Sequence, residues 1–156
     1  MLTGRDRRRL LFAALGYFVF VIYGSLVPLH FRPVPLVDAW ERFEAIPYLN
    51  LGIGSRADWV ANILLFVPLA FLWLGALWPP PGRFARVLAS GIVLTACVVS
   101  SVAIEFTQVF FPPRTVSMND LVAESLGAVV GIVLWWTTGQ KFVDWINGWA
   151  ATRTRT

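Results

Sequence analysis

Charged residues are scarce in this sequence of 156 residues. Asp, Glu, Lys and Arg together make up 14% of it, whereas soluble domains usually carry about a quarter. Hydrophobic residues make up 57%, and the mean hydropathy is +0.66. A chain with so little polar material does not supply the surface of an ordinary soluble domain, so the composition indicates a membrane protein.

Cysteine and histidine are nearly absent, with Cys97 and His30 the only examples. A single cysteine excludes an internal disulfide, and no Cys or His spacing typical of a zinc site is present. Cys97 lies in an apolar run and is interpreted as a small buried side chain. We therefore expect no metal and no cofactor.

The 13 basic residues do not form the single patch that is typical of nucleic-acid binding. Four of them lie in the segment RDRRRL at residues 5–10, and the others are scattered through short stretches between apolar runs. Such a distribution is typical of charges that orient a membrane protein. Nucleic acid is therefore not an expected partner.

Long apolar runs are what the sequence has instead. About 20 apolar residues cross the hydrocarbon core of a bilayer as a helix. Four runs predict an all-α membrane protein, a single domain over residues 1–156 built as a four-transmembrane-helix bundle. Asn119 is the predicted N-cap of the last helix, with Asp120 in its first turn. The predicted helices cover about residues 10–29, 59–78, 87–111 and 120–137.

The positions of the basic residues predict that both termini lie in the cytoplasm. In this arrangement nine basic residues, Arg153 and Arg155 among them, lie inside and four lie outside. At the C-terminal end, residues 139–151 predict a separate amphipathic helix on the cytoplasmic membrane surface. A shorter amphipathic pattern covers residues 36–44. The apolar face of the C-terminal helix would consist of Phe142, Trp145, Ile146 and Trp149.

Polar residues collect at the outer end of the predicted bundle. The second helix begins there, the third ends there and the fourth begins there, so their polar side chains are expected to form one pocket. Ionisable residues at such positions are costly to bury and usually functional. The predicted pocket residues are Asn62, Glu105, Gln108, Arg114, Asp120 and Glu124.

Arg114 is the one cation in this predicted pocket, and its forked donors suit a phosphate or a carboxylate. A simpler interpretation is that it pairs with Glu105 or Asp120 and only holds the turn. A hard cation bound by Glu105, Asp120 and Glu124 is a further alternative, which no other feature of the sequence supports.

Gly127 and Gly131 have the spacing that lets membrane helices approach closely. They share a helical face with Asp120 and Glu124, which predicts a tight hairpin of the third and fourth helices below the pocket. The same pair of glycines predicts a possible homo-oligomer. Pro68 is expected to shape the second helix.

Two segments resemble the VanZ-like family of small bacterial membrane proteins: DWVANILLFVPLAF at residues 58–71 and IEFTQVFFPPRTVSMNDLVAESLGAVVG at residues 104–131. Glu124 stands where this family usually has Asn, and Ala70 where it usually has Gly. The resemblance implies a multi-pass envelope protein, and the name-giving member is associated with low-level resistance to the glycopeptide teicoplanin. The positions that match the family pattern are Asn62, Pro68, Glu105, Gln108, Arg114, Asp120 and Gly127.

Together these features favour a protein of the bacterial inner (cytoplasmic) membrane that binds a membrane lipid or lipid-linked envelope precursor by its headgroup, with Arg114 holding the anion. A membrane enzyme using Glu105 and Asp120 as acid and base is the alternative. It is less favoured because no nucleophile or metal motif accompanies these carboxylates. A small transporter and a ligand-free scaffold also stay open.

Overall fold

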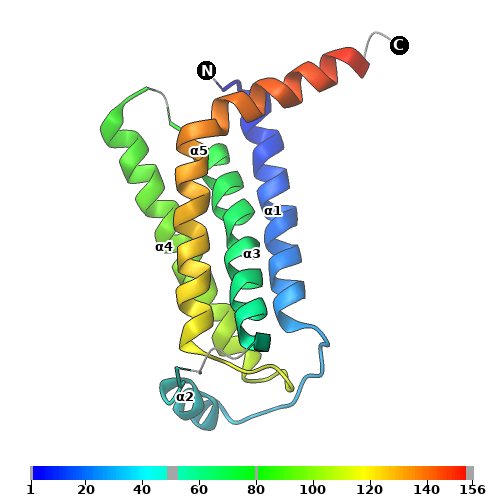
Figure 1. Ribbon diagram of the computed structural model, residues 1–156, viewed down its shortest axis with the longest axis vertical. Coiled ribbons are helices and arrows are strands. Elements are labelled where there is room, and N and C mark those ends of the chain that lie inside the picture. Colours follow the sequence, from blue (N-terminus) through cyan, green and yellow to red (C-terminus); the bar gives the residue numbers. More distant parts are fainter. Residues whose placement is uncertain (1, 49–52, 80, 154–156) are drawn as a thin grey trace.

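Helices form all of the regular structure in the residues that the structure describes (Figure 1). The computed structural model describes residues 2–48, 53–79 and 81–153, with the backbone alone at residues 53–55 and 151–153. For these residues the all-α prediction is confirmed. The helices are α1 (Gly4–Leu26), α2 (Leu36–Glu44), α3 (Ile53–Leu77), α4 (Arg83–Gln108) and α5 (Met118–Arg153).

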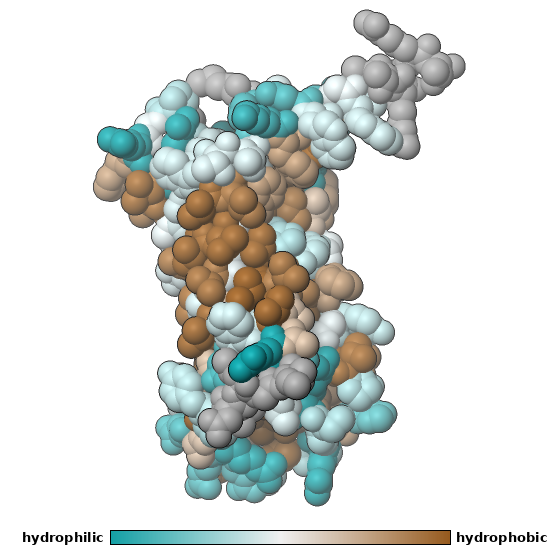
Figure 2. Space-filling model, viewed as in Figure 1, coloured by the Kyte–Doolittle hydropathy of each residue, from teal (hydrophilic) through white to brown (hydrophobic). Residues whose placement is uncertain are grey.

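Four of the described helices, α1, α3, α4 and α5, are long and apolar enough to cross a membrane. The four predicted spans are therefore confirmed, although α1, α3 and α4 begin earlier than predicted, at Gly4, Ile53 and Arg83. Hydropathy marks only the apolar part of a span, whereas helical hydrogen bonds continue into the polar residues beside it. Figure 2 shows hydrophobic residues across the middle of the bundle and hydrophilic residues towards both ends.

The hydrophobic side chains of the bundle face both inwards and outwards. Phe66, Leu69 and Leu74 of α3 are at most 1% exposed, while Phe12 of α1 and Val99 of α4 are more than 60% exposed. Apolar residues that point away from a protein core need an apolar solvent. This arrangement is the one expected of helices surrounded by lipid.

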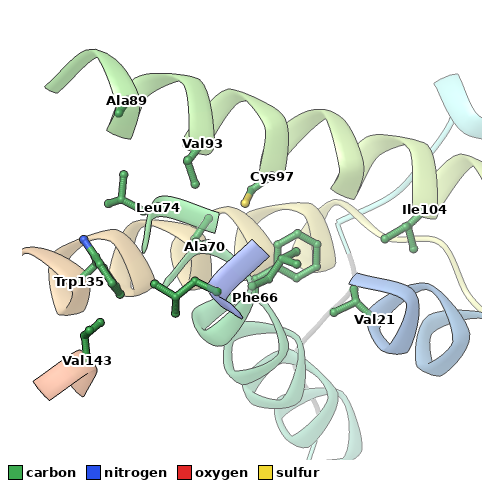
Figure 3. Close-up of a cluster of buried hydrophobic side chains, with 13 residues drawn as sticks. Val21, Phe66, Ala70, Leu74, Ala89, Val93, Cys97, Ile104, Trp135 and Val143 are labelled. Carbon is green, nitrogen blue, oxygen red and sulfur yellow. The ribbon is translucent and has the colours of Figure 1, made fainter. Parts of the chain in front are cut away.

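α3 lies at the centre of the packing, against α5, α1 and α4. Figure 3 shows Phe66, Ala70 and Leu74 of α3 close to the side of α4 that carries Val93 and Cys97. Cys97 is 3% exposed, as expected for a small buried side chain. α3 runs without a break through Pro68, which the structure places inside the helix.

Gly127 and Gly131 of α5 pack against α3. The prediction that they pack against the third span, residues 87–111, was therefore wrong. A Cβ atom at Gly127 would lie 2.3 Å from the carbonyl oxygen of Ile63, and one at Gly131 would lie 2.3 Å from that of Val67. The spacing of small residues marks a face for close packing but does not say which helix occupies it. An association of two chains through these glycines stays a prediction, and it would need a face that α3 covers here.

The C-terminal part of α5 (orange to red in Figure 1) turns across the end of the bundle. The structure has one continuous helix to Arg153, where two helices separated near residue 138 were predicted. The prediction was wrong about the break because Thr137, Thr138 and Gln140 lower the hydropathy there without interrupting backbone hydrogen bonds. A location of this part on the membrane surface stays a prediction.

Both ends of the described chain lie at the same end of the bundle (Figure 1). Asn147 Nδ2 donates to Asp6 Oδ1 at 3.1 Å, and Arg9 donates to Asn147 Oδ1 at 3.2 Å. These bonds hold the C-terminal part of α5 against the start of α1. Arg155, which contributed to the predicted orientation, lies outside the described residues, and the orientation stays a prediction.

Candidate functional site

A cavity of about 250 Å³ opens between the C-terminal end of α1, the start of α3, the end of α4 and the turn that leads into α5. This volume has room for several water molecules or a small polar group, since one water occupies about 30 Å³ in the liquid. We call it the polar cavity. Five of the six predicted pocket residues line it, namely Asn62, Glu105, Gln108, Arg114 and Asp120.

Asp120 is held from two sides. Asn62 Nδ2 of α3 donates to its Oδ1 at 2.7 Å, and Ser117 Oγ donates to its Oδ2 at 2.7 Å. The backbone N–H of Asp120 in turn donates to Ser117 Oγ at 3.3 Å. Ser117 is therefore the N-cap of α5, and the prediction of Asn119 was wrong. Both residues are good caps, so the sequence alone does not decide between them.

Glu105 connects to the same residue from α4. Its side chain is 1% exposed, and its Oε2 accepts a hydrogen bond of 3.2 Å from the backbone N–H of Ser117. Ser117 thus contacts two of the predicted carboxylates, one through its backbone and one through its hydroxyl. The wall of the polar cavity is built from carboxylates that neutral donors hold in place.

Glu124 is the predicted pocket residue that does not line the polar cavity. It is 1% exposed, and Ser101 Oγ of α4 donates a hydrogen bond to its Oε2. Glu124 follows Asp120 by about one helical turn, which carries it deeper into the bundle. The structure therefore places it behind the cavity, between α4 and α5.

Gln108 and Arg114 both bind the C-terminal end of α1. Gln108 Nε2 donates to the carbonyl oxygen of Ser25 at 3.1 Å, and Arg114 Nη2 donates to that of Gly24 at 2.7 Å. The last carbonyl groups of a helix have no partner within it, and its dipole favours a cation there. Among the described residues Arg114 makes this bond and no ion pair with Glu105 or Asp120.

Comparison with known proteins assigns the family. The sequence profile of the VanZ/LLP1 family matches residues 10–139. The chain belongs to the VanZ/LLP1 family. All residues of the polar cavity lie within the matched range. Neither the comparison with curated proteins nor the comparison with solved structures gave a match.

The two departures from the VanZ-like pattern lie away from the lining of the polar cavity. Ala70 is fully buried, and a Cβ atom at Gly131 would lie 3.0 Å from the Cβ of Ala70. Gly131 therefore leaves the room that the methyl group of Ala70 occupies. Glu124, where the family usually has Asn, is the acceptor for Ser101, a role that an amide oxygen also fills.

Sequence reasoning missed three residues of the candidate site in this VanZ/LLP1 protein. Ser117 had a signal, because Ser-x-x-Asp before an apolar run is a capping motif. Asp58 lines the polar cavity and precedes Asn62 by four residues, so both lie on one face of α3. Ser25 contributes through its backbone carbonyl, which no sequence pattern reveals. His30 is exposed and does not line the cavity.

The chemistry of the polar cavity is that of hydrogen bonding and charge. In the part of the chain that the structure describes, no three His, Cys, Asp or Glu side chains are grouped to hold a metal ion. The alternative of a cation bound by Glu105, Asp120 and Glu124 therefore has no support in the geometry. The carboxylates of Asp58 and Asp120 can accept from an amine or hydroxyl, and Arg114 can donate to an anion.

Proposed function

We propose that this VanZ/LLP1 protein binds a membrane lipid or a lipid-linked envelope precursor, with the headgroup of the ligand in the polar cavity. The observation that carries the proposal is a second, apolar cavity along α1, α3 and α4, three of the helices that line the polar cavity. A ligand with a polar head and a hydrocarbon chain requires both environments in this order. A soluble polar ligand would use the polar cavity alone.

The apolar cavity has a volume of about 180 Å³ and is lined by residues of α1, α3 and α4. On α3 it begins at Leu69, one helical turn beyond Leu65 of the polar cavity. On α4 it includes Ala96 and Ser100, on the side of Glu105 that leads into the bundle. In the apolar cavity, a hydrocarbon chain would contact apolar side chains and would lie at the same depth as the surrounding lipid chains.

The headgroup would be recognised by groups of both signs. Arg114 uses one of its five N–H donors on Gly24, which leaves donors for a phosphate or carboxylate oxygen. Asp58 and Asp120, which line the same cavity, would accept from an amine or hydroxyl of the same headgroup. This combination favours a headgroup that carries an anion next to a donor.

The proposed location is the inner membrane of a bacterium, with both termini in the cytoplasm and the polar cavity at the outer leaflet. Basic residues near α1 and at the start of α4 support this orientation under the positive-inside rule. Trp145 and Trp149 are more than half exposed on the C-terminal part of α5, which suits a position at the cytoplasmic interface.

Native mass spectrometry of protein purified in a mild detergent tests the proposal. We expect the unaltered protein to retain a co-purifying lipid, and Ala96→Phe to lose it because the new ring fills the apolar cavity. The matched control is Ala103→Phe, an exposed position on α4 that lines neither cavity. Absence of bound lipid from the unaltered protein, or equal binding by both variants, would overturn the proposal and favour a ligand-free scaffold.

A further inference from the structure

A cavity lined by three arginines lies beside the polar cavity and shares Arg114 with it. Its volume is about 260 Å³, and the cationic side chains in its lining are those of Arg32, Arg42 and Arg114. The other lining residues are apolar, and no Asp or Glu is among the described residues that line it. We call it the arginine cavity.

Three separate parts of the chain bring these arginines together. Arg32 follows α1, and its backbone N–H donates to the carbonyl oxygen of Phe110 at 2.8 Å. Arg42 lies on α2, which contacts α4 through Phe43 and Phe106 with ring centroids 5.4 Å apart. These backbone and aromatic contacts hold the segments that carry Arg32 and Arg42 against α4 and the turn after it. The arginine side chains are therefore brought together by contacts that they do not make themselves.

No carboxylate among the described residues makes a hydrogen bond or ion pair with the arginines of the arginine cavity. The guanidinium groups of Arg32 and Arg42 make no hydrogen bond or ion pair in the described part of the chain, and that of Arg114 binds only the neutral Gly24 carbonyl. The acidic residues of α2 do not line the cavity, and Glu44 accepts from Trp40 Nε1 at 2.7 Å instead. Neighbouring like charges repel, so an anion between them lowers the free energy of the protein.

We propose that the arginine cavity binds a phosphate or pyrophosphate group. A guanidinium presents parallel N–H donors that match two oxygens of a phosphate, and several of them around one group favour a multiply charged anion over a single carboxylate. The site shares Arg114 with the polar cavity but needs neither that cavity's carboxylates nor the apolar cavity, so Arg32 and Arg42 test it apart from lipid binding. The phosphate can belong to a lipid headgroup or be free in solution.

The test compares two double variants that remove the same charge. Arg32→Gln with Arg42→Gln alters the arginine cavity, and Arg8→Gln with Arg83→Gln alters exposed arginines at the other end of the bundle. Isothermal titration calorimetry with inorganic pyrophosphate measures binding of a free anion. Titration with phosphatidic acid, against phosphatidylcholine as the neutral lipid, followed by native mass spectrometry, measures binding of a lipid-borne phosphate.

We expect the cavity variant to bind about tenfold more weakly or worse than both the control variant and the unaltered protein, because each lost bond to a charged group weakens binding substantially. Binding of pyrophosphate alone assigns a free anion, and binding of phosphatidic acid alone assigns a lipid headgroup. No binding of either probe, or equal binding by both double variants, would overturn the proposal.

Two further measurements keep this result separate from folding and from the proposed lipid binding. Arg42→Lys retains the charge but loses the fork, so we expect a smaller loss of affinity than for Arg42→Gln. Ala96→Phe blocks the apolar cavity and is expected to leave pyrophosphate binding unchanged. Failure of the lipid proposal therefore appears in Ala96→Phe, whereas failure of the anion site appears in the arginine variants.

Discussion

Asn62 of α3 donates a hydrogen bond of 2.7 Å to Asp120 of α5, two residues that are 58 positions apart in the sequence. The bond joins the beginning of the central helix to the first turn of the last one. Because Ser117 binds the other oxygen of the same carboxylate, Asp120 is oriented from both sides. Asp120 therefore links α3 to the N-cap of α5 in the lining of the polar cavity.

A double-mutant cycle measures the energy of this bond. Asn62→Ala, Asp120→Ala and the double variant should show a coupling free energy of about 1 kcal/mol, in the range known for hydrogen bonds between membrane helices. The measurement is unfolding in mixed detergent micelles with increasing dodecyl sulfate. The control cycle pairs Asn62 with Asp144, which lies on the C-terminal part of α5 and should show no coupling. A coupling near zero for both pairs would contradict the structure.

Substitution of Gly127 by Ala should destabilise the protein by about 1–3 kcal/mol, because the new methyl group meets the backbone of α3 and cannot be accommodated by a rotation of side chains. Gly91 is the matched control, since a Cβ atom there would have no atom within 4 Å. Gly91→Ala should be neutral or stabilise the protein by about 0.5–1 kcal/mol. Equal effects at the two glycines in unfolding experiments would rule out the close α3–α5 packing.

Loss of the N-cap of α5 is expected to cost about 1 kcal/mol, so Ser117→Ala should lower the free energy of unfolding by that amount. Ser117→Thr retains the hydroxyl and should restore most of it. Ser125→Ala serves as the control, because Ser125 Oγ donates only to the Leu121 carbonyl within α5. The cap assignment fails if Ser117→Ala and Ser125→Ala behave alike.

The orientation of the bundle can be read from the reactivity of single cysteines in a Cys97→Ser background. Thr115 lies in the exposed turn before α5 and Gly82 directly before α4, at opposite ends of the bundle. We expect Thr115→Cys to react with a membrane-impermeant maleimide in intact cells, and Gly82→Cys to react only after permeabilisation. The reverse pattern would place the polar cavity on the cytoplasmic side.

The membrane-spanning helices were predictable because each one carries its own signal. An apolar run of sufficient length must become a helix in lipid, whatever its neighbours are. The ends were less well predicted: α3 extends to Ile53 through Arg56 and Asp58, which hydropathy treats as loop. The missing break in α5 has the same origin, since a few polar residues do not end a helix.

The partners of individual side chains were the part that the sequence could not supply. The spacing of Ser101, Glu105 and Gln108 puts them on one face of α4, and all three are buried. It did not show that Gln108 contacts α1, that Ser101 covers Glu124, or that the glycines of α5 meet α3. Such contacts depend on the order of the helices around the bundle, which no local pattern encodes.

The hydrogen bonds at the end of α1 have a consequence for the assembly of the protein during its synthesis. The donors to Ser25 and Gly24 come 83 and 90 positions later in the chain, from Gln108 and Arg114. When α1 enters the bilayer, the carbonyl groups of Gly24 and Ser25 lack these donors, because Gln108 and Arg114 have not yet been translated. The first helix to be inserted therefore reaches its finished state only after the third span and the following turn have emerged from the ribosome.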